Sequence, residues 1–82
     1  MAIVRDPQWL ALWKEIIANV DHQHAARLAT LTVRDGWFNG HHLVVVADEP
    51  MGSDFDGALT AAREAAWRIG QVRLTIEGNL AS

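Results

Sequence analysis

Cysteine is absent from the 82-residue chain, and basic residues are few. Without cysteine the chain can form no disulfide, no thiolate metal site and no cysteine nucleophile. This absence also agrees with a reducing compartment. Seven Lys and Arg residues against ten Asp and Glu residues give a formal net charge of −3. That balance argues against direct nucleic-acid binding, which usually needs a basic surface to neutralise phosphates.

Targeting and membrane signals are lacking as well. Residues 1–6 show no basic segment followed by an apolar run, as a secretory signal would. The most apolar stretches are too short to span a bilayer or contain charges such as Lys14 and Glu15. We therefore expect a cytoplasmic protein with no membrane partner.

Apolar residues, by contrast, are abundant. Half of the chain is hydrophobic, and four residues are Trp. This content is enough to build a hydrophobic core without disulfides and argues against disorder. No internal repeat or linker interrupts the chain, so we interpret residues 1–82 as a single domain.

The first half of the chain predicts one helix between two β-prone segments. Residues 2–5 are a short β-prone stretch, and a helix is predicted from Pro7 to Val20, with Asp6 as its N-cap. Apolar residues recur at helical spacing in this helix: Trp9, Trp13, Ile16, Ile17 and Val20. After a connector at 21–24, alternating apolar and polar residues predict a strand at 28–34.

A hairpin is predicted next, with its turn undecided. Asp-Gly at 35–36 and Asn-Gly at 39–40 are both typical of two-residue hairpin turns. Either position joins the strand at 28–34 to a continuous apolar run at 43–47. Such a run predicts a central, buried strand.

A second helix is predicted with Ser53 or Asp54 as its N-cap and with Gly70 placed to stop it, and alternation predicts a last strand at 72–77. If residues 2–5 pair, the order is β-α-β-β-α-β, which is ferredoxin-like. If they do not, the order is α-β-β-α-β. Either order predicts an α+β fold, a two-layer sandwich with an antiparallel sheet and two helices on one face.

The four histidines show no metal-binding pattern. His22 and His24 precede one strand of the hairpin, and His41 and His42 precede the other. Antiparallel strands of about seven residues place the two pairs roughly 20 Å apart. His41 and His42 are also neighbours in sequence, so in a strand they point to opposite faces. We therefore predict no histidine metal site.

Acidic residues gather before and at the start of the second helix: Asp48, Glu49, Asp54 and Asp56. A calcium loop starting at Asp54 would need Gly where Leu59 stands and Glu where Ala65 stands. The carboxylates are better explained as partners of the free N–H groups of the helix, with contact to a basic partner as the alternative. No serine lies in a nucleophile-elbow sequence. We predict no catalytic residue, cofactor or metal.

Four residues of the hairpin are predicted to contact a partner: Trp37, Phe38, Leu43 and Val45. Trp37 and Phe38 lie in or beside the hairpin tip, where exposed aromatic rings anchor interfaces. The alternative is that the tip folds back and one ring covers the core. Leu43 and Val45 belong to a strand that is apolar on both faces. Either the open sheet face is covered by a partner, or it tolerates one apolar strand.

Trp67 is the fifth predicted partner-binding residue. It lies beside Arg63 and Glu64, off the apolar face of the second helix. Its indole either stacks with Arg63 or seals the edge of the core.

Together these features predict a non-catalytic protein–protein interaction module, a small inhibitor or regulator of a larger protein. Phage and mobile-element proteins that block host defences belong to this class. The partner is another protein or a second copy, which would form a homodimer through the open sheet face. One alternative is a small dimeric enzyme or ligand-binding domain that uses a His42–Asp35 pair. Another is a subunit of a larger homo-oligomeric assembly.

Overall fold

In residues 7–49 and 52–78, which the computed structural model describes, three α-helices and three β-strands follow one another. A 3₁₀ turn, η1, precedes the third helix. In chain order the elements are α1 (Gln8–Ala18), α2 (His22–Leu28), β1 (Val33–Phe38), β2 (His42–Ala47), η1 (Ser53–Phe55), α3 (Asp56–Gly70) and β3 (Arg73–Gly78). The strand expected at 2–5 and the expected cap Asp6 lie outside the described residues.

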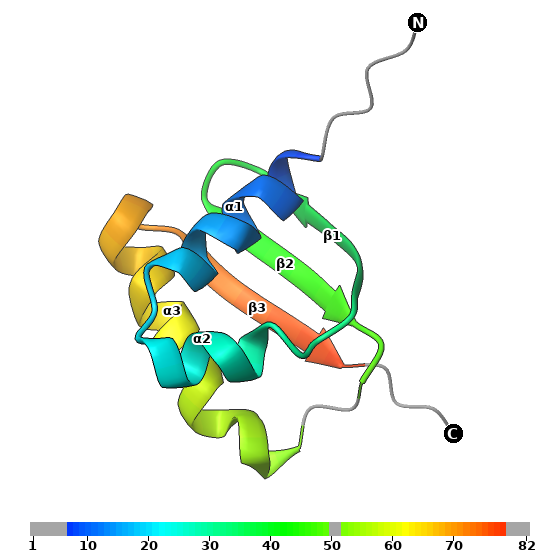
Figure 1. Ribbon diagram of the computed structural model, residues 1–82. Helices are drawn as coiled ribbons and strands as arrows, with labels where there is room; N and C mark the ends of the chain where they lie inside the picture. The colour runs from blue at the N-terminus through cyan, green and yellow to red at the C-terminus, as the bar shows by residue number, and fades with distance from the viewer. Residues whose placement is uncertain (1–6, 50–51, 79–82) are drawn as a thin grey trace, which may run out of the picture.

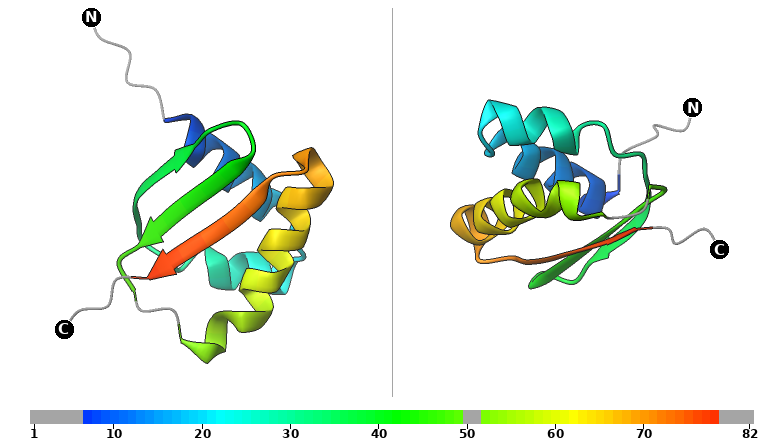
Figure 2. Two further views of the ribbon diagram at one scale, coloured as in Figure 1. Left: turned by 180° about the vertical axis from the view of Figure 1, so that it is seen from behind. Right: turned by 90° about the horizontal axis from the view of Figure 1, so that it is seen from below.

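The helices and the sheet form two layers. All three helices lie on one face of the sheet, and no element of the described ranges covers the opposite face (Figure 1; Figure 2). The predicted α+β two-layer sandwich is therefore confirmed, with three helices in place of two. None of the helices in these ranges combines the length and apolarity that crossing a bilayer requires.

The sheet is mixed, which corrects the expectation of an antiparallel sheet. β2 is central, with β1 antiparallel on one side and β3 parallel on the other. β2 and β3 pair from His42 with Arg73 to Ala47 with Gly78. Because α3 returns the chain to the starting end of β2, β3 then runs in the same direction as β2. The ferredoxin-like order is not confirmed, and the described order is α-α-β-β-α-β.

Helix α2 replaces the predicted connector and the first residue of the strand predicted at 28–34; a turn follows it, and β1 begins only at Val33. Asp21 caps this helix: its carboxylate accepts the backbone N–H of His24 and lies 2.7 Å from the His24 Nδ1 atom. The backbone turns again at Thr30, whose hydroxyl donates to the Arg27 carbonyl at 2.6 Å. Leu28 and Leu31 both reach the core, so the helix and its exit are held by packing as well as by the cap.

The hairpin turn lies at the Asn-Gly pair, which settles the open choice. The Asn39 side-chain carbonyl accepts the backbone N–H groups of His41 and His42 at 2.9 and 2.8 Å. Gly40 has a φ of 98°, a conformation that glycine adopts without strain. Asp35 and Gly36 instead lie inside β1, opposite Val46 and Val45.

The core lies between the helices and the sheet. Its largest fully buried side chains are Ile16, Leu28, Leu43 and Val45. The helical spacing predicted for the first helix is confirmed at Trp13 and Ile16, which are buried in this core. α3 contributes mainly alanines, which let its backbone lie close to the sheet: Ala58, Ala62, Ala65 and Ala66.

Candidate interaction surface

Strand alternation decides which side of β2 is available to a partner. Leu43 and Val45 are fully buried and belong to the core between the sheet and the helices. Their assignment as partner-contacting residues on the open face is therefore wrong. The open face of this strand is formed by its other set of side chains, His42, Val44 and Val46. The apolar character predicted for that face comes from the two valines.

The same alternation separates the two aromatic residues of the hairpin. Phe38 pairs with Leu43 and packs half-buried against the core, so it is not a surface anchor. Trp37 pairs with Val44 and is 49% exposed. Of the pair, the open face therefore carries only Trp37.

His42 connects Trp37 to the far strand. The Trp37 and His42 rings meet edge to face, with centroids 5.5 Å apart and planes at 67°. The His42 Nε2 atom lies 2.7 Å from the Thr75 hydroxyl oxygen on β3. A ring contact on one side and a hydrogen bond on the other hold the imidazole across the three strands.

Trp67 lines a pocket together with His42. It is 59% exposed, and with Trp37 it forms the set of large exposed apolar side chains in the described ranges. This pocket of about 230 Å³ joins it to the strand ends and is lined by His41, His42, Trp67, Gln71 and Arg73. Since His42 also contacts Trp37, the two indoles belong to one continuous surface. We call Trp37, His42 and Trp67 the indole surface.

The pocket forms where three elements meet. His41 and His42 stand at the start of β2, and Arg73 stands at the start of β3 as the pairing partner of His42. The Arg73 N–H donates to the His41 carbonyl at 2.9 Å, which fixes the two strand ends together. Trp67 and Gln71 come from the end of α3. The pocket therefore depends on the parallel pairing of β2 with β3.

Gln71 holds an uncommon backbone conformation at the pocket wall. Its φ and ψ are 52° and 39°, in the left-handed region that usually favours glycine. Its N–H donates to the Trp67 carbonyl at 2.8 Å and so ends the helix. A non-glycine residue in this conformation costs about 1–2 kcal/mol. Such strain is often found at ligand-binding positions.

Charge is distributed unevenly along the open face. Arg73 and His42 lie at the pocket end, which His41 also lines, and Arg73 has no ion pair within the described part of the chain. Carboxylates lie at the opposite end of the strands, at Asp48 and Glu77. Asp48 is 3.5 Å from the Arg34 guanidinium. The pocket end therefore presents cationic and hydrogen-bond-donating groups, and the far end presents two carboxylates, one of which is paired with Arg34.

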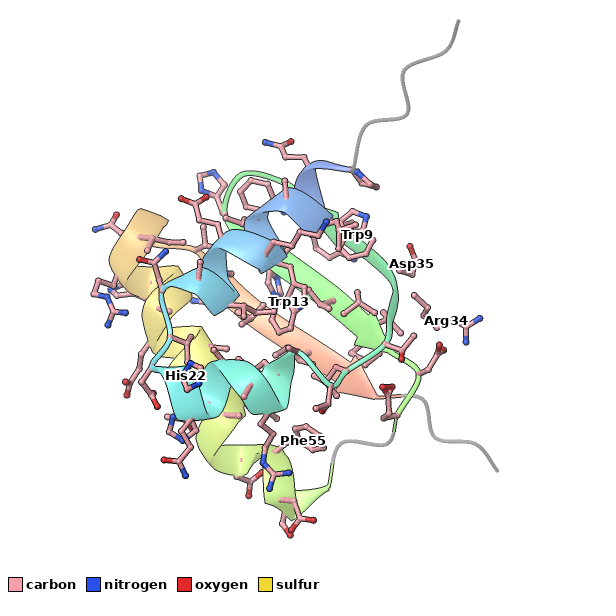
Figure 3. The ribbon with its side chains drawn as sticks, viewed as in Figure 1. Trp9, Trp13, His22, Arg34, Asp35 and Phe55 are labelled. Carbon is pink, nitrogen blue, oxygen red and sulfur yellow. The ribbon has the colours of Figure 1, made fainter. Side chains whose placement is uncertain are left out.

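Asp35 and His42, the pair that the alternative enzyme function would use, are not bonded to each other in the structure. The Asp35 carboxylate accepts the backbone N–H of Gly36 at 2.8 Å, whereas the His42 ring is bonded to Thr75. Asp35 lies at the outer edge of β1 (Figure 3). His22 and His24 stand on α2, away from the hairpin, and His24 is bonded to Asp21. The described ranges contain no group of three potential metal ligands.

Two further features concern the remaining aromatic and apolar residues. The cation–π contact found in the described ranges joins Arg27 to Phe55, with the guanidinium carbon 5.4 Å from the ring centroid; Trp67 with Arg63 does not form one.

A second cavity of about 270 Å³ lies between α1, α2 and the start of β1. Its lining is mostly apolar, with Leu10, Ile17 and Leu31 among the side chains.

Comparison of the chain with protein-family models, with curated proteins and with solved structures found no match.

Proposed function

We propose that the protein is a non-catalytic protein–protein interaction module that inhibits or regulates a larger protein by occupying part of its surface. The indole surface is the contact region. The observation that carries the proposal is the exposure of Trp37 and Trp67, at 49% and 59%, around one imidazole: the Trp37 ring contacts His42, and Trp67 lines a pocket with it. Trp13, in contrast, is buried to 3% exposure in the core.

Large exposed indoles favour this function for energetic reasons. Tryptophan offers a large apolar area with few rotatable bonds, so its burial by a partner contributes much binding energy at a small entropic cost. Interface hot spots are enriched in Trp and Arg, and they cluster at the centre of the contact. Trp37, Trp67 and Arg73 supply both residue types around His42.

A quantitative capture experiment tests the proposal. Tagged wild-type protein and the double variant Trp37→Ala/Trp67→Ala are incubated with extract of the source cell, and captured proteins are measured by mass spectrometry. We expect specific partners of the wild type to be lost from the double variant and retained by Glu15→Ala, a change at an exposed position of α1. Equal capture by the folded double variant would contradict the proposal.

A second copy of the chain is a further candidate partner. The observation in its favour is the pair of valines on the open sheet face: Val44, 7% exposed, lies between Trp37 and Thr75, and Val46, half-buried, lies between Asp35 and Glu77. A homodimer would cover these side chains with their own equivalents. Measurement of the mass in solution distinguishes the two cases: a dimer that Trp37→Ala dissociates supports self-association, and a monomer at all concentrations rejects it.

A further inference from the structure

We infer that the pocket beside Trp67 binds a carboxylate side chain from an acidic peptide segment of the partner protein. This inference rests on the proposed function and adds the chemistry of the partner. The pocket-lining groups are an arginine, two imidazoles, an amide and an indole.

The polar lining is suited to an anion. Arg73 has no ion pair in the described ranges, so its guanidinium can donate two parallel hydrogen bonds to a carboxylate. His42 is its direct neighbour across the strands. When the Thr75 hydroxyl donates to His42 Nε2, the ring proton is on Nδ1, which can also donate. The Gln71 amide adds a further donor. These groups can donate hydrogen bonds to the oxygens of a carboxylate from several directions.

The size and the apolar wall of the pocket restrict the ligand further. A volume of about 230 Å³ is below the usual range of about 300–1,000 Å³ for sites that enclose a whole small molecule. One side chain of a longer segment fits that size better. The exposed Trp67 indole forms an apolar wall, against which an aliphatic neighbour of the acidic residue can pack.

Charge complementarity also favours an acidic segment and sets its position. The chain as a whole carries a net charge of −3, so it repels acidic partners at most of its surface. The pocket end of the open face is the exception, since Asp48 and Glu77 lie at the opposite end. An acidic segment is therefore directed to the pocket and away from the far end.

NMR titration of the full chain tests the inference without knowledge of the partner. The probes are acetyl-Glu-Leu-Glu-amide and its neutral analogue acetyl-Gln-Leu-Gln-amide, added up to about 10 mM because a contact of this size gives affinities near the millimolar range. We expect the acidic peptide to shift the Trp67 indole N–H and the backbone signals of Gln71 and Arg73. The buried Trp13 indole signal is expected to stay in place. The neutral analogue is expected to bind about tenfold more weakly, because it lacks the charged hydrogen bonds.

Two variants complete the test. Arg73→Gln is expected to weaken binding of the acidic peptide about tenfold. Arg34→Gln, which removes the same charge at the far end of the sheet, is expected to leave the affinity for this peptide unchanged. Equal binding of the two peptides, an equal effect of the two variants, or tighter binding of inorganic phosphate than of the peptide would each overturn the inference. If the acidic peptide does not bind while the double Trp variant still loses its captured partner, only the inference about the pocket is wrong. If the double Trp variant keeps its partner, the proposed function itself is wrong.

Discussion

The indole of Trp9 lies directly against the backbone of Gly36. A Cβ built on Gly36 would stand 2.6 Å from the Trp9 Cε3 atom and 2.6 Å from the Val44 carbonyl oxygen. Both distances are too short for any side chain, so glycine is required at this point of β1. Figure 3 shows Trp9 on α1 over this strand. The contact joins the helical layer to the edge strand that also carries Trp37.

We expect Gly36→Ala to destabilise the protein by about 1–3 kcal/mol, since the added methyl group must displace a ring or a strand backbone. The free energy of unfolding is measured by urea denaturation. Gly52→Ala is the matched control, because a Cβ at that position meets no atom within 4 Å. Its effect should stay within about 0.5 kcal/mol. Equal effects of the two changes would show that Trp9 does not press on Gly36.

The tryptophans are expected to separate into a structural and a functional group. Trp13→Ala should cost about 3–5 kcal/mol, because it leaves a cavity in the core. Trp67→Ala should change the free energy of unfolding by less than about 1 kcal/mol, since most of its side chain is already in water. Thermal or urea denaturation of both variants checks this. A large loss of stability in Trp67→Ala would show that the Trp67 indole has a structural role.

The sequence predicted the α+β fold class but not that β3 runs parallel to β2. Helical spacing identified α1 and α3, and alternation identified β3, because each element has one clear apolar face. Residues 28–34 were ambiguous: Leu28 and Leu31 fit a helical face, while Leu31 and Val33 fit a strand face. The signal that was missed is Asp21, a good N-cap directly before α2. With α2 in place, the hairpin begins later and turns at Asn39.

The candidate site could be predicted only in part, for a related reason. Trp67 could be selected because it falls off the apolar face of its helix, and Trp37 because it lies beside the hairpin tip, an argument that selected the half-buried Phe38 as well. Leu43 and Val45 could not be assigned to a face, because an unbroken apolar run carries no alternation and only the register decides. The link between His42 and Arg73 needed the parallel pairing of β2 with β3, which joins residues 31 positions apart and has no local signature.

Asp21 is expected to make stability depend on pH. The hydrogen bond with the His24 ring lowers the pKa of this carboxyl below its ordinary value. A lowered pKa in the folded state means that the ionised carboxylate stabilises the fold above the unfolded-state pKa of about 3.9. That contribution is lost as the pH falls through the lowered folded-state value.

Asp21→Asn keeps a capping oxygen and removes the charge, so it isolates this effect. We expect the variant to melt at a lower temperature than the wild type at neutral pH, with the difference shrinking as the pH falls from about 5 to about 2. Glu64→Gln, at an exposed position of α3, is the charge-matched control and should follow the wild type. A melting-temperature difference that is the same at every pH would rule out the ionic contribution.

Gln71 provides a test of whether strain at the pocket serves binding. Gln71→Gly removes the cost of the left-handed conformation, but the greater freedom of glycine in the unfolded chain offsets part of this, so we expect a gain of about 0.5–1 kcal/mol in the free energy of unfolding. The same change removes the amide from the pocket, so the acidic peptide should bind more weakly. Gly70→Ala is the control. Its Cβ would meet Val72 at an ordinary 3.5 Å, and it should add about 0.5–1 kcal/mol without affecting the peptide. If Gln71→Gly gains stability and keeps full peptide affinity, the Gln71 side chain contributes nothing to the pocket and its strain has no function there.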